Sequence, residues 1–364
     1  MKDNPDIKTR QKGEKMLRKI LTLVLLSFPV AAYSAETDHY TVPESEVVDI
    51  TAELNEYSNA AVAEILAKIN AQGGCGEGAR EIYRDEDGNS YGYSKNDEER
   101  LYEGLGEIFE IHGKSRLVDD LLAGKMPRTV IPLKESVYGE WSVSNGYLLG
   151  RTGAGESPLA LAPLIKVGGL VIGTDKLEHM FGLGYDYFKR HYMKGMSLKK
   201  VLKIGVAAEK TYLGGNILAT GVFTYADLSA NFNGMRFWNH MLQKEDDLLG
   251  KEHNYGPYIV CEGGKWKQNP ARPIDLSRYV DKTFQENLNC SKFASQGGVD
   301  KFNASLARLR AKHGDSRSFS CPTSKSELEE AAAKYMVSMK DGGTIDHWII
   351  NREGNAAVSY FNEF

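Results

Sequence analysis

Two short polar patterns on otherwise apolar segments in the middle of the chain constrain its fold most. The first runs from Asp175 to His179, and the second runs from Asp227 to Asn231. Burying acids, bases and amides costs several kcal/mol per group unless these groups are paired, bind a metal or do chemistry. We therefore expect the helices that carry these patterns to bring the polar groups together at one buried site.

The first pattern can be explained in part as a helix start. Helical patterning resumes at Thr174, so Asp175 can cap the helix and Glu178 can complete a capping box, which would leave Lys176 exposed to solvent. Capping does not explain His179, because apolar and small residues follow it. Asp175 and His179 are four residues apart and share a helix face if the helix contains both.

Glu209 is a further polar residue on an apolar helix face. The helix is expected to begin near Ser197, and Glu209 follows Gly205 by four residues and precedes Tyr212 by three, on or beside the apolar stripe. Buried glutamates are rare and normally have a partner. Two interpretations stay open: a structural ion pair with Lys176, or a metal ligand or general base whose pKa is raised by burial.

The third polar element is a helix expected to start at Thr224, which can cap it. Asp227, Asn231 and Gly234 then lie on one face. A glycine on the same face as an acid and an amide indicates that another backbone packs closely there and receives hydrogen bonds. The structural interpretation is a polar seam that holds two helices together.

Three carboxylates and one imidazole are available for a common site, and we expect them as metal ligands: Asp175, His179, Glu209 and Asp227. This set suits a divalent metal such as zinc, or manganese or iron, which could activate water for hydrolysis. His179 and Glu209 are then the expected catalytic residues, with Lys176 and Asn231 in support. A metal-free alternative has His179 as a base oriented by a carboxylate. In a noncatalytic alternative, the same residues form a structural hydrogen-bond network.

Residues 1–35 have the features of a secretory signal peptide. Basic residues precede an apolar run from Ile20 to Phe28, and small residues offer cleavage after Ser34, which we prefer, or after Ala35. Met16 is an alternative start. Neither this run nor any later segment reaches the ~18–20 apolar residues of a membrane-spanning helix. We expect a periplasmic or secreted protein without a transmembrane segment in the mature chain.

Removing residues 1–34 takes away seven basic and three acidic residues and changes the net charge from −4 to −8. Nonspecific nucleic-acid binding relies on basic patches. We therefore expect no nucleic-acid partner.

Four cysteines follow the leader, and an even number in an exported chain predicts two disulfides. No two of them have the short spacing of a zinc knuckle. Three connectivities are open, and we favour Cys290 with Cys321 and Cys75 with Cys261.

Hydrophobic periodicity predicts an α+β, mainly α-helical protein. After the signal peptide (1–35), we expect an N-terminal helical region (36–125), a β-hairpin section (126–173), a helical core with the polar site (174–250) and a disulfide-tied C-terminal region (251–364). Hairpin turns are expected at Asp87-Gly88, Asn145-Gly146 and Gly168-Gly169. One helical stretch is expected over 97–123, and further helices over 274–288, 299–312 and 324–339.

The polar residues occur in the order D-K-x-x-H, then a glutamate, then D-L-x-x-N-x-x-G, carried by Asp175, Lys176, His179, Glu209, Asp227, Leu228, Asn231 and Gly234. This order resembles a group of uncharacterised exported bacterial envelope proteins, and VanZ-like membrane proteins show a looser version of it. The match covers residues 174–238. The resemblance implies a site at these residues but no settled reaction, and this chain departs from the VanZ-like proteins in having no expected membrane span. We therefore expect an exported envelope protein, either a metal-assisted hydrolase acting on an envelope lipid or glycan or a noncatalytic structural or binding protein.

Overall fold

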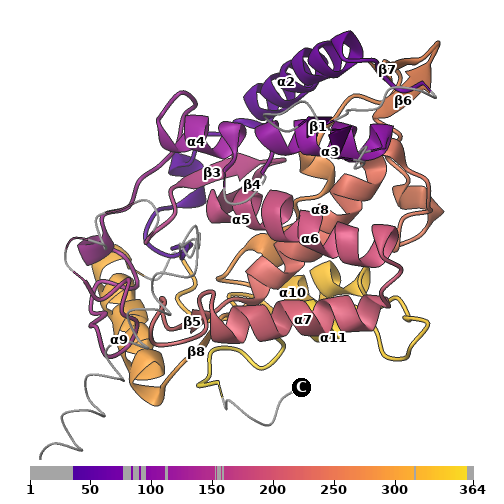
Figure 1. Ribbon diagram of the computed structural model, residues 1–364. Coiled ribbons are helices and arrows are strands. Elements are labelled where there is room, and N and C mark those ends of the chain that lie inside the picture. Colours follow the sequence, from indigo (N-terminus) through magenta and orange to yellow (C-terminus); the bar gives the residue numbers. More distant parts are fainter. Residues whose placement is uncertain are drawn as a thin grey trace, which may run out of the picture. The chain divides into compact units, whose positions relative to one another are not determined.

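The computed structural model describes residues 36–76, 83–84, 90–91, 96–110, 114–151, 153, 157, 160–314 and 317–358 (Figure 1). These residues belong to one compact unit, which spans residues 33–364. The expected signal peptide and the Asp87-Gly88 turn lie outside the described residues. In the described part, the protein is mainly helical with small antiparallel sheets, which confirms the predicted fold class.

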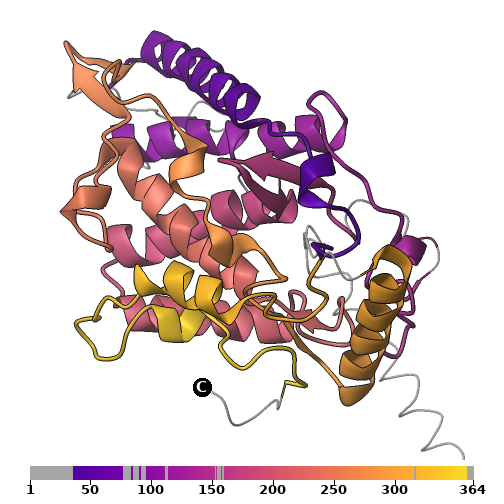
Figure 2. The same ribbon diagram turned by 180° about the vertical axis from the view of Figure 1, so that it is seen from behind.

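Helix α8 (Tyr225–Leu242) is the central element, because all of its residues except Leu242 are buried. It packs against a helical rod that begins with α5 (Asp175–Glu178), continues through the π-helical segment His179–Leu183 and α6 (Gly184–Phe188), and ends with a second π-helical segment, Lys189–Met193. Helix α7 (Leu198–Thr211) and the short α11 (Asp346–Ile349) also contact α8. Seen from behind, the yellow C-terminal helices lie beside α7 and α8 (Figure 2).

The rod and α8 approach each other closely through two glycines. A Cβ atom at Gly234 would lie 1.8 Å from the carbonyl oxygen of Met180, and one at Gly184 would lie 2.6 Å from the Cα of Gly234. The close backbone packing predicted from Gly234 is therefore present, and it sets Asp227 and Asn231 of α8 against the start of the rod.

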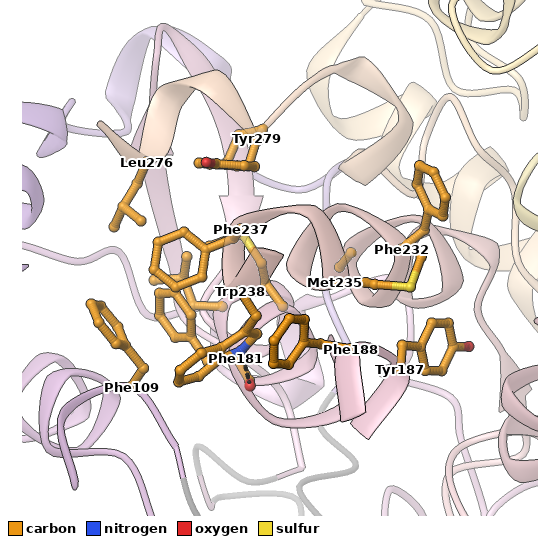
Figure 3. Close-up of a cluster of buried hydrophobic side chains, with 14 of the residues drawn as sticks. Phe109, Phe181, Tyr187, Phe188, Phe232, Met235, Phe237, Trp238, Leu276 and Tyr279 are labelled. Carbon is orange, nitrogen blue, oxygen red and sulfur yellow. Dashed lines mark hydrogen bonds between the residues drawn. The ribbon is translucent and has the colours of Figure 1, made fainter. Parts of the chain in front are cut away.

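The apolar core surrounds the second half of α8. Aromatic rings from the rod and α8 pack on one another and on Phe109, and the indole N–H of Trp238 donates a hydrogen bond to the carbonyl oxygen of Phe181 at 2.8 Å (Figure 3). Phe109 packs edge-on against Phe237. This packing fixes the crossing of the two helical elements on which the polar residues lie.

Three helices cover the N-terminal side: α2 (Thr51–Ala71), α3 (Asp97–Ile108) and α4 (Arg116–Leu122). The single helical stretch expected over 97–123 is thus two helices. Asn96 and Glu99 form a capping box at the start of α3, and Ser115 caps α4 through the N–H of Val118. A second capping residue inside the predicted stretch is the local reason for two helices instead of one.

Four two-stranded antiparallel sheets occur in the part of the chain that the structure describes: β1 (Tyr83–Arg84) with β2 (Ser90–Tyr91), β3 (Leu164–Val167) with β4 (Leu170–Gly173), β5 (Val222–Phe223) with β8 (Lys292–Phe293), and β6 (Ile259–Glu262) with β7 (Lys265–Gln268). The β3–β4 hairpin turns at Gly168 and Gly169, whose φ angles are 61° and 78°, as predicted. These left-handed conformations favour glycine.

The hairpin predicted at Asn145-Gly146 is wrong. Residues 137–150 form a series of turns, because the Asn145 side chain accepts hydrogen bonds from Ser142 and the N–H of Tyr147 bonds to the carbonyl oxygen of Ile217. The backbone of this section therefore pairs with a distant loop and not with a neighbouring strand.

In the C-terminal region, α9 (Gln296–His313) and α10 (Lys325–Ala333) confirm two predicted helices. The helix predicted over 274–288 is wrong, since that segment contains only two short 3-10 turns. The side chains of Asp275 and Asp281 each accept a hydrogen bond from the backbone two residues on, which competes with a continuous helix. The 3-10 segments among the described residues are Glu44–Glu46, Leu133–Glu135, Lys251–His253, Leu276–Arg278 and Lys282–Phe284.

Both predicted disulfides are present, Cys75–Cys261 and Cys290–Cys321. The first joins the end of α2 to β6, where the N–H of Cys75 also bonds to the carbonyl oxygen of Gly264. Among the described helices, none has the length and apolar character needed to cross a membrane.

Candidate functional site

Three of the predicted site residues meet at one buried point. Each of His179, Glu209 and Asp227 offers a ligand atom, and these atoms all lie within 4.8 Å of one another. His179 Nε2 is 3.2 Å from Asp227 Oδ2. The three residues are 4%, 0% and 4% exposed, respectively. His179 is also the first residue of a π-helical segment, a distortion that often occurs at functional sites.

The imidazole of His179 faces oxygen atoms on both sides. Nδ1 lies 3.1 Å from Asn231 Oδ1, and Nε2 faces Asp227. If Nδ1 donates to Asn231, Nε2 either carries a second proton or directs its lone pair toward a cation shared with Asp227. Metal-bound histidines usually have their other nitrogen oriented in this way by an oxygen.

Glu209 has an unsatisfied carboxylate oxygen. Oε1 accepts a hydrogen bond from the N–H of Thr224 at 3.4 Å, while Oε2 has no hydrogen-bond partner among the described residues. Burial, and then the charge of Asp227, raise the pKa of Glu209 well above its ordinary value. A buried carboxylate in this state is stabilised by a proton or by a cation.

Lys176 is fully buried, so its predicted exposure to solvent is wrong. Its Nζ lies 2.6 Å from Asp175 Oδ2, 2.5 Å from Asp227 Oδ1 and 2.6 Å from Glu286 Oε1. These contacts replace the ion pair with Glu209 that one interpretation of the sequence expected. Burial without partners would cost several kcal/mol for such an ammonium group, which is why three carboxylates surround it.

Asp175 belongs to the group around Lys176 and does not cap the helix. Its Oδ1 accepts a hydrogen bond from the hydroxyl of Thr37 at 2.7 Å, and its Oδ2 contacts Lys176. The expected capping box with Glu178 is wrong, since the helix is capped at Thr174 without a side-chain hydrogen bond. Asp175 thus forms, with Asp227 and Glu286, a second group whose oxygens lie within 4.8 Å of one another.

Two acidic residues of the centre were missed in the sequence. Glu36 is 2% exposed and accepts hydrogen bonds from the hydroxyls of Thr220 and Thr224. Burial raises the pKa of Glu36 well above its ordinary value and raises that of Glu286 to about 8, although Lys176 opposes the second shift. Neither residue lies in a motif or on a patterned apolar face, so no local signal marks them.

The centre therefore holds more negative than positive groups. The centre contains the ammonium group of Lys176 and five buried carboxylates, of which the first three listed contact Lys176: Asp175, Asp227, Glu286, Glu36 and Glu209. The raised pKa values of Glu36, Glu209 and Glu286 show that protons can compensate part of this charge. A divalent cation between His179, Glu209 and Asp227 would compensate it as well.

A glycine-containing loop, residues 212–221, packs against the site. A Cβ atom at Gly214 would lie 2.9 Å from Glu36 Oε1 and 3.0 Å from Glu209 Oε1, so glycine allows the loop to pack directly on both carboxylates. The side chains of His179 and Asp227 are only 5% and 6% exposed. The site is therefore enclosed in this structure.

The fold and the site define a mainly α-helical α+β protein with a buried acidic centre around one lysine and one histidine. No family model, curated protein or solved structure matches the chain. The geometry of the centre is therefore the basis on which a function can be assigned.

Proposed function

We propose that the protein is an exported, metal-dependent hydrolase whose divalent ion binds to His179, Glu209 and Asp227. The observation that carries the proposal is the convergence of these three ligand atoms, one of which comes from a buried carboxylate with an unsatisfied oxygen. Catalytic zinc sites usually have three protein ligands and keep one position for water, whereas structural zinc sites have four, mainly cysteines. The ligand number and type here suit the catalytic class.

The surrounding residues would orient the ligands. Asn231 holds Nδ1 of His179, and Lys176 holds Oδ1 of Asp227, which leaves Nε2 and Oδ2 directed toward each other. A bound divalent ion lowers the pKa of a coordinated water and polarises the bond that is cleaved. The proposed catalytic residues are His179 and Glu209.

An envelope lipid or glycan is the proposed substrate, and exposed apolar side chains on the loop 212–221 favour a lipid. Ile217 and Leu218 are 41% and 81% exposed, and the 40% exposed Tyr147 is joined to them by the hydrogen bond from its N–H to the carbonyl oxygen of Ile217. Apolar and tyrosine side chains of this kind suit contact with a lipid surface. The signal-peptide features and the two disulfides support the export that the proposal requires.

The second candidate is a noncatalytic envelope protein in which the same residues hold helices together. The observation that favours it is the closure of the site, since Lys176 and Glu209 have no exposed surface. In that case protons, and not a metal, would compensate the buried carboxylates.

Metal analysis of the purified mature protein separates the two candidates. We expect one Zn²⁺ or Mn²⁺ ion per chain in the wild type, and at least about 100-fold weaker binding in His179→Ala and Glu209→Gln, because each removes a ligand. The matched control is Glu178→Gln. Glu178 is a buried acid next to His179 whose pKa burial also raises, but it lies outside the ligand group, so metal binding should persist.

Circular dichroism should show that all three variants are folded. Absence of metal from the wild type would contradict the proposal. The proposal would also be contradicted if His179→Ala and Glu209→Gln lost their fold but bound as much metal as the wild type. Metal binding without hydrolysis of envelope lipid or glycan fractions would support the metal site and contradict the hydrolase activity.

A further inference from the structure

Lys176 occupies a position that has the form of a cation site. The carboxylate groups of Asp175, Asp227 and Glu286 each place one oxygen 2.5–2.6 Å from its Nζ, and one oxygen of each lies within 4.8 Å of the others. The ammonium group and the carboxylates are almost completely buried. A compact positive charge thus lies inside a cage of oxygens, as a metal ion would.

This position shares a carboxylate with the proposed metal site. Asp227 directs Oδ1 to the ammonium group of Lys176 and Oδ2 to Nε2 of His179. Hydrolytic centres with two metal ions, about 3.5–4 Å apart, place two cations within reach of the same ligands. The unsatisfied Oε2 of Glu209 belongs to the first position, so the two positions are marked by independent observations.

We infer that the centre has two cation positions and that the ammonium group of Lys176 permanently replaces the second cation. Lys176 has no exposed surface and its three contacts are all to carboxylates, so it cannot itself touch a substrate. It is a positioning residue, because it holds Asp227, one of the proposed metal ligands. The metal at the first position rests on the proposed function, but the second position does not.

The second position has only oxygen ligands, which suit hard cations such as Mn²⁺, Ca²⁺ and Mg²⁺. Removing the lysine side chain leaves three buried carboxylates without a counter-charge and with space for an ion. A variant that lacks the side chain should therefore bind one more Mn²⁺ ion than the wild type.

The experiment compares the number of Mn²⁺ ions bound per chain in the wild type, Lys176→Ala and Lys176→Met. We expect Lys176→Ala to bind one ion more than the wild type, and its two ions to give an exchange-coupled electron paramagnetic resonance spectrum through Asp227. Lys176→Met is the matched control, because it removes the charge but fills the space, and it should gain no ion. An equal number of ions in folded Lys176→Ala and in the wild type would overturn the inference.

If Lys176→Ala does not fold alone, refolding is measured against Mn²⁺ concentration. The inference predicts refolding that depends on Mn²⁺ and is absent in Lys176→Met, and failure to refold at saturating Mn²⁺ would overturn it. The difference between variant and wild type also separates this inference from the proposed function. No ion in the wild type and one in Lys176→Ala would refute only the proposed function, whereas one ion in each would refute only the second position.

Discussion

His39 is held in one neutral form by hydrogen bonds at both ring nitrogens. The N–H of Glu286 donates to Nδ1 at 3.3 Å, so Nδ1 carries no proton and Nε2 donates to the carbonyl oxygen of Val171 at 3.2 Å. Burial, and then the positive charge of Lys176, lower the pKa of His39 to about 3. The contacts and the pKa shift therefore agree that this buried side chain is uncharged at neutral pH.

The pKa of His39 leads to a prediction about acid stability. A histidine whose pKa is lower in the folded than in the unfolded state stabilises the fold above the unfolded value of about 6.5, and this contribution is lost as the pH falls toward the folded value. Between pH 7 and pH 5 the loss should be about 2 kcal/mol. Urea unfolding of the wild type and His39→Gln at both pH values measures it.

His39→Gln should be less stable than the wild type at pH 7, by about 1–2 kcal/mol, because it removes the hydrogen bonds of the imidazole. Because glutamine cannot take up a proton, the variant should lose less stability than the wild type between pH 7 and pH 5. Glu36, Glu209 and Glu286 act in the opposite direction, because acids with a raised pKa stabilise the fold as the pH falls. The comparison of the two proteins separates these effects. The same change with pH in both would show that His39 does not titrate as described.

Among the helices, the crossing of α8 and the rod depends on the absence of side chains at the contact. Gly184 and Gly234 let the two backbones meet, and this contact sets the distance between His179 on the rod and Asp227 on α8. The periodicity of the sequence indicated these helices and the glycine face. It could not indicate that Lys176 points inward, because the three carboxylates that stabilise it come partly from other segments.

Substituting Gly234 with alanine tests the crossing. A Cβ atom 1.8 Å from the carbonyl oxygen of Met180 must push the helices apart, so we expect a loss of about 1–3 kcal/mol in the free energy of unfolding. The better helix propensity of alanine offsets this loss only in part. Gly297→Ala in α9 is the matched control, since its Cβ would have no neighbour nearer than 3.5 Å and should leave stability unchanged or raised by up to about 1 kcal/mol. Equal effects in both variants, measured by urea unfolding, would mean that the close contact is not important for stability.

For the whole molecule, the disulfide Cys75–Cys261 joins segments 186 residues apart in sequence. It connects the end of α2 to β6, and β6 contacts α8. The segment that leads into β6 bonds to His240, near the C-terminal end of α8, whereas the proposed ligand Asp227 lies in the first turn of that helix. Its contribution should therefore concern the stability of the fold and not the site.

The prediction is that Cys75→Ser with Cys261→Ser lowers the free energy of unfolding by about 2–4 kcal/mol, because the unfolded chain gains freedom when a long loop is opened. The number of metal ions bound per folded chain should stay the same as in the wild type. Urea unfolding and metal analysis of the double variant measure both quantities. A loss of metal from the folded variant would show that this disulfide also supports the site.

Local sequence patterns were sufficient for several features. Apolar spacing predicted most helices, Gly168-Gly169 predicted a hairpin, and the four cysteines predicted the two observed disulfides. Each of these features depends on residues close in sequence or on the pairing of a few rare residues. Asn145-Gly146 had an equally strong local pattern, but its backbone groups bond to the loop around Ile217, so the local prediction was wrong.

The sequence by itself determined that polar groups lie on apolar helices and must be buried together. Only the tertiary structure decided how these groups pair: Lys176 lies among three carboxylates, and His179 faces Asp227. It also decided that one carboxylate oxygen of Glu209 is left unsatisfied. It also added Glu36, which precedes the helical core in sequence, and Glu286, which follows it. The physical reason is that the energy of a buried charge depends on which other charges surround it in space, and those neighbours come from segments that no local pattern connects.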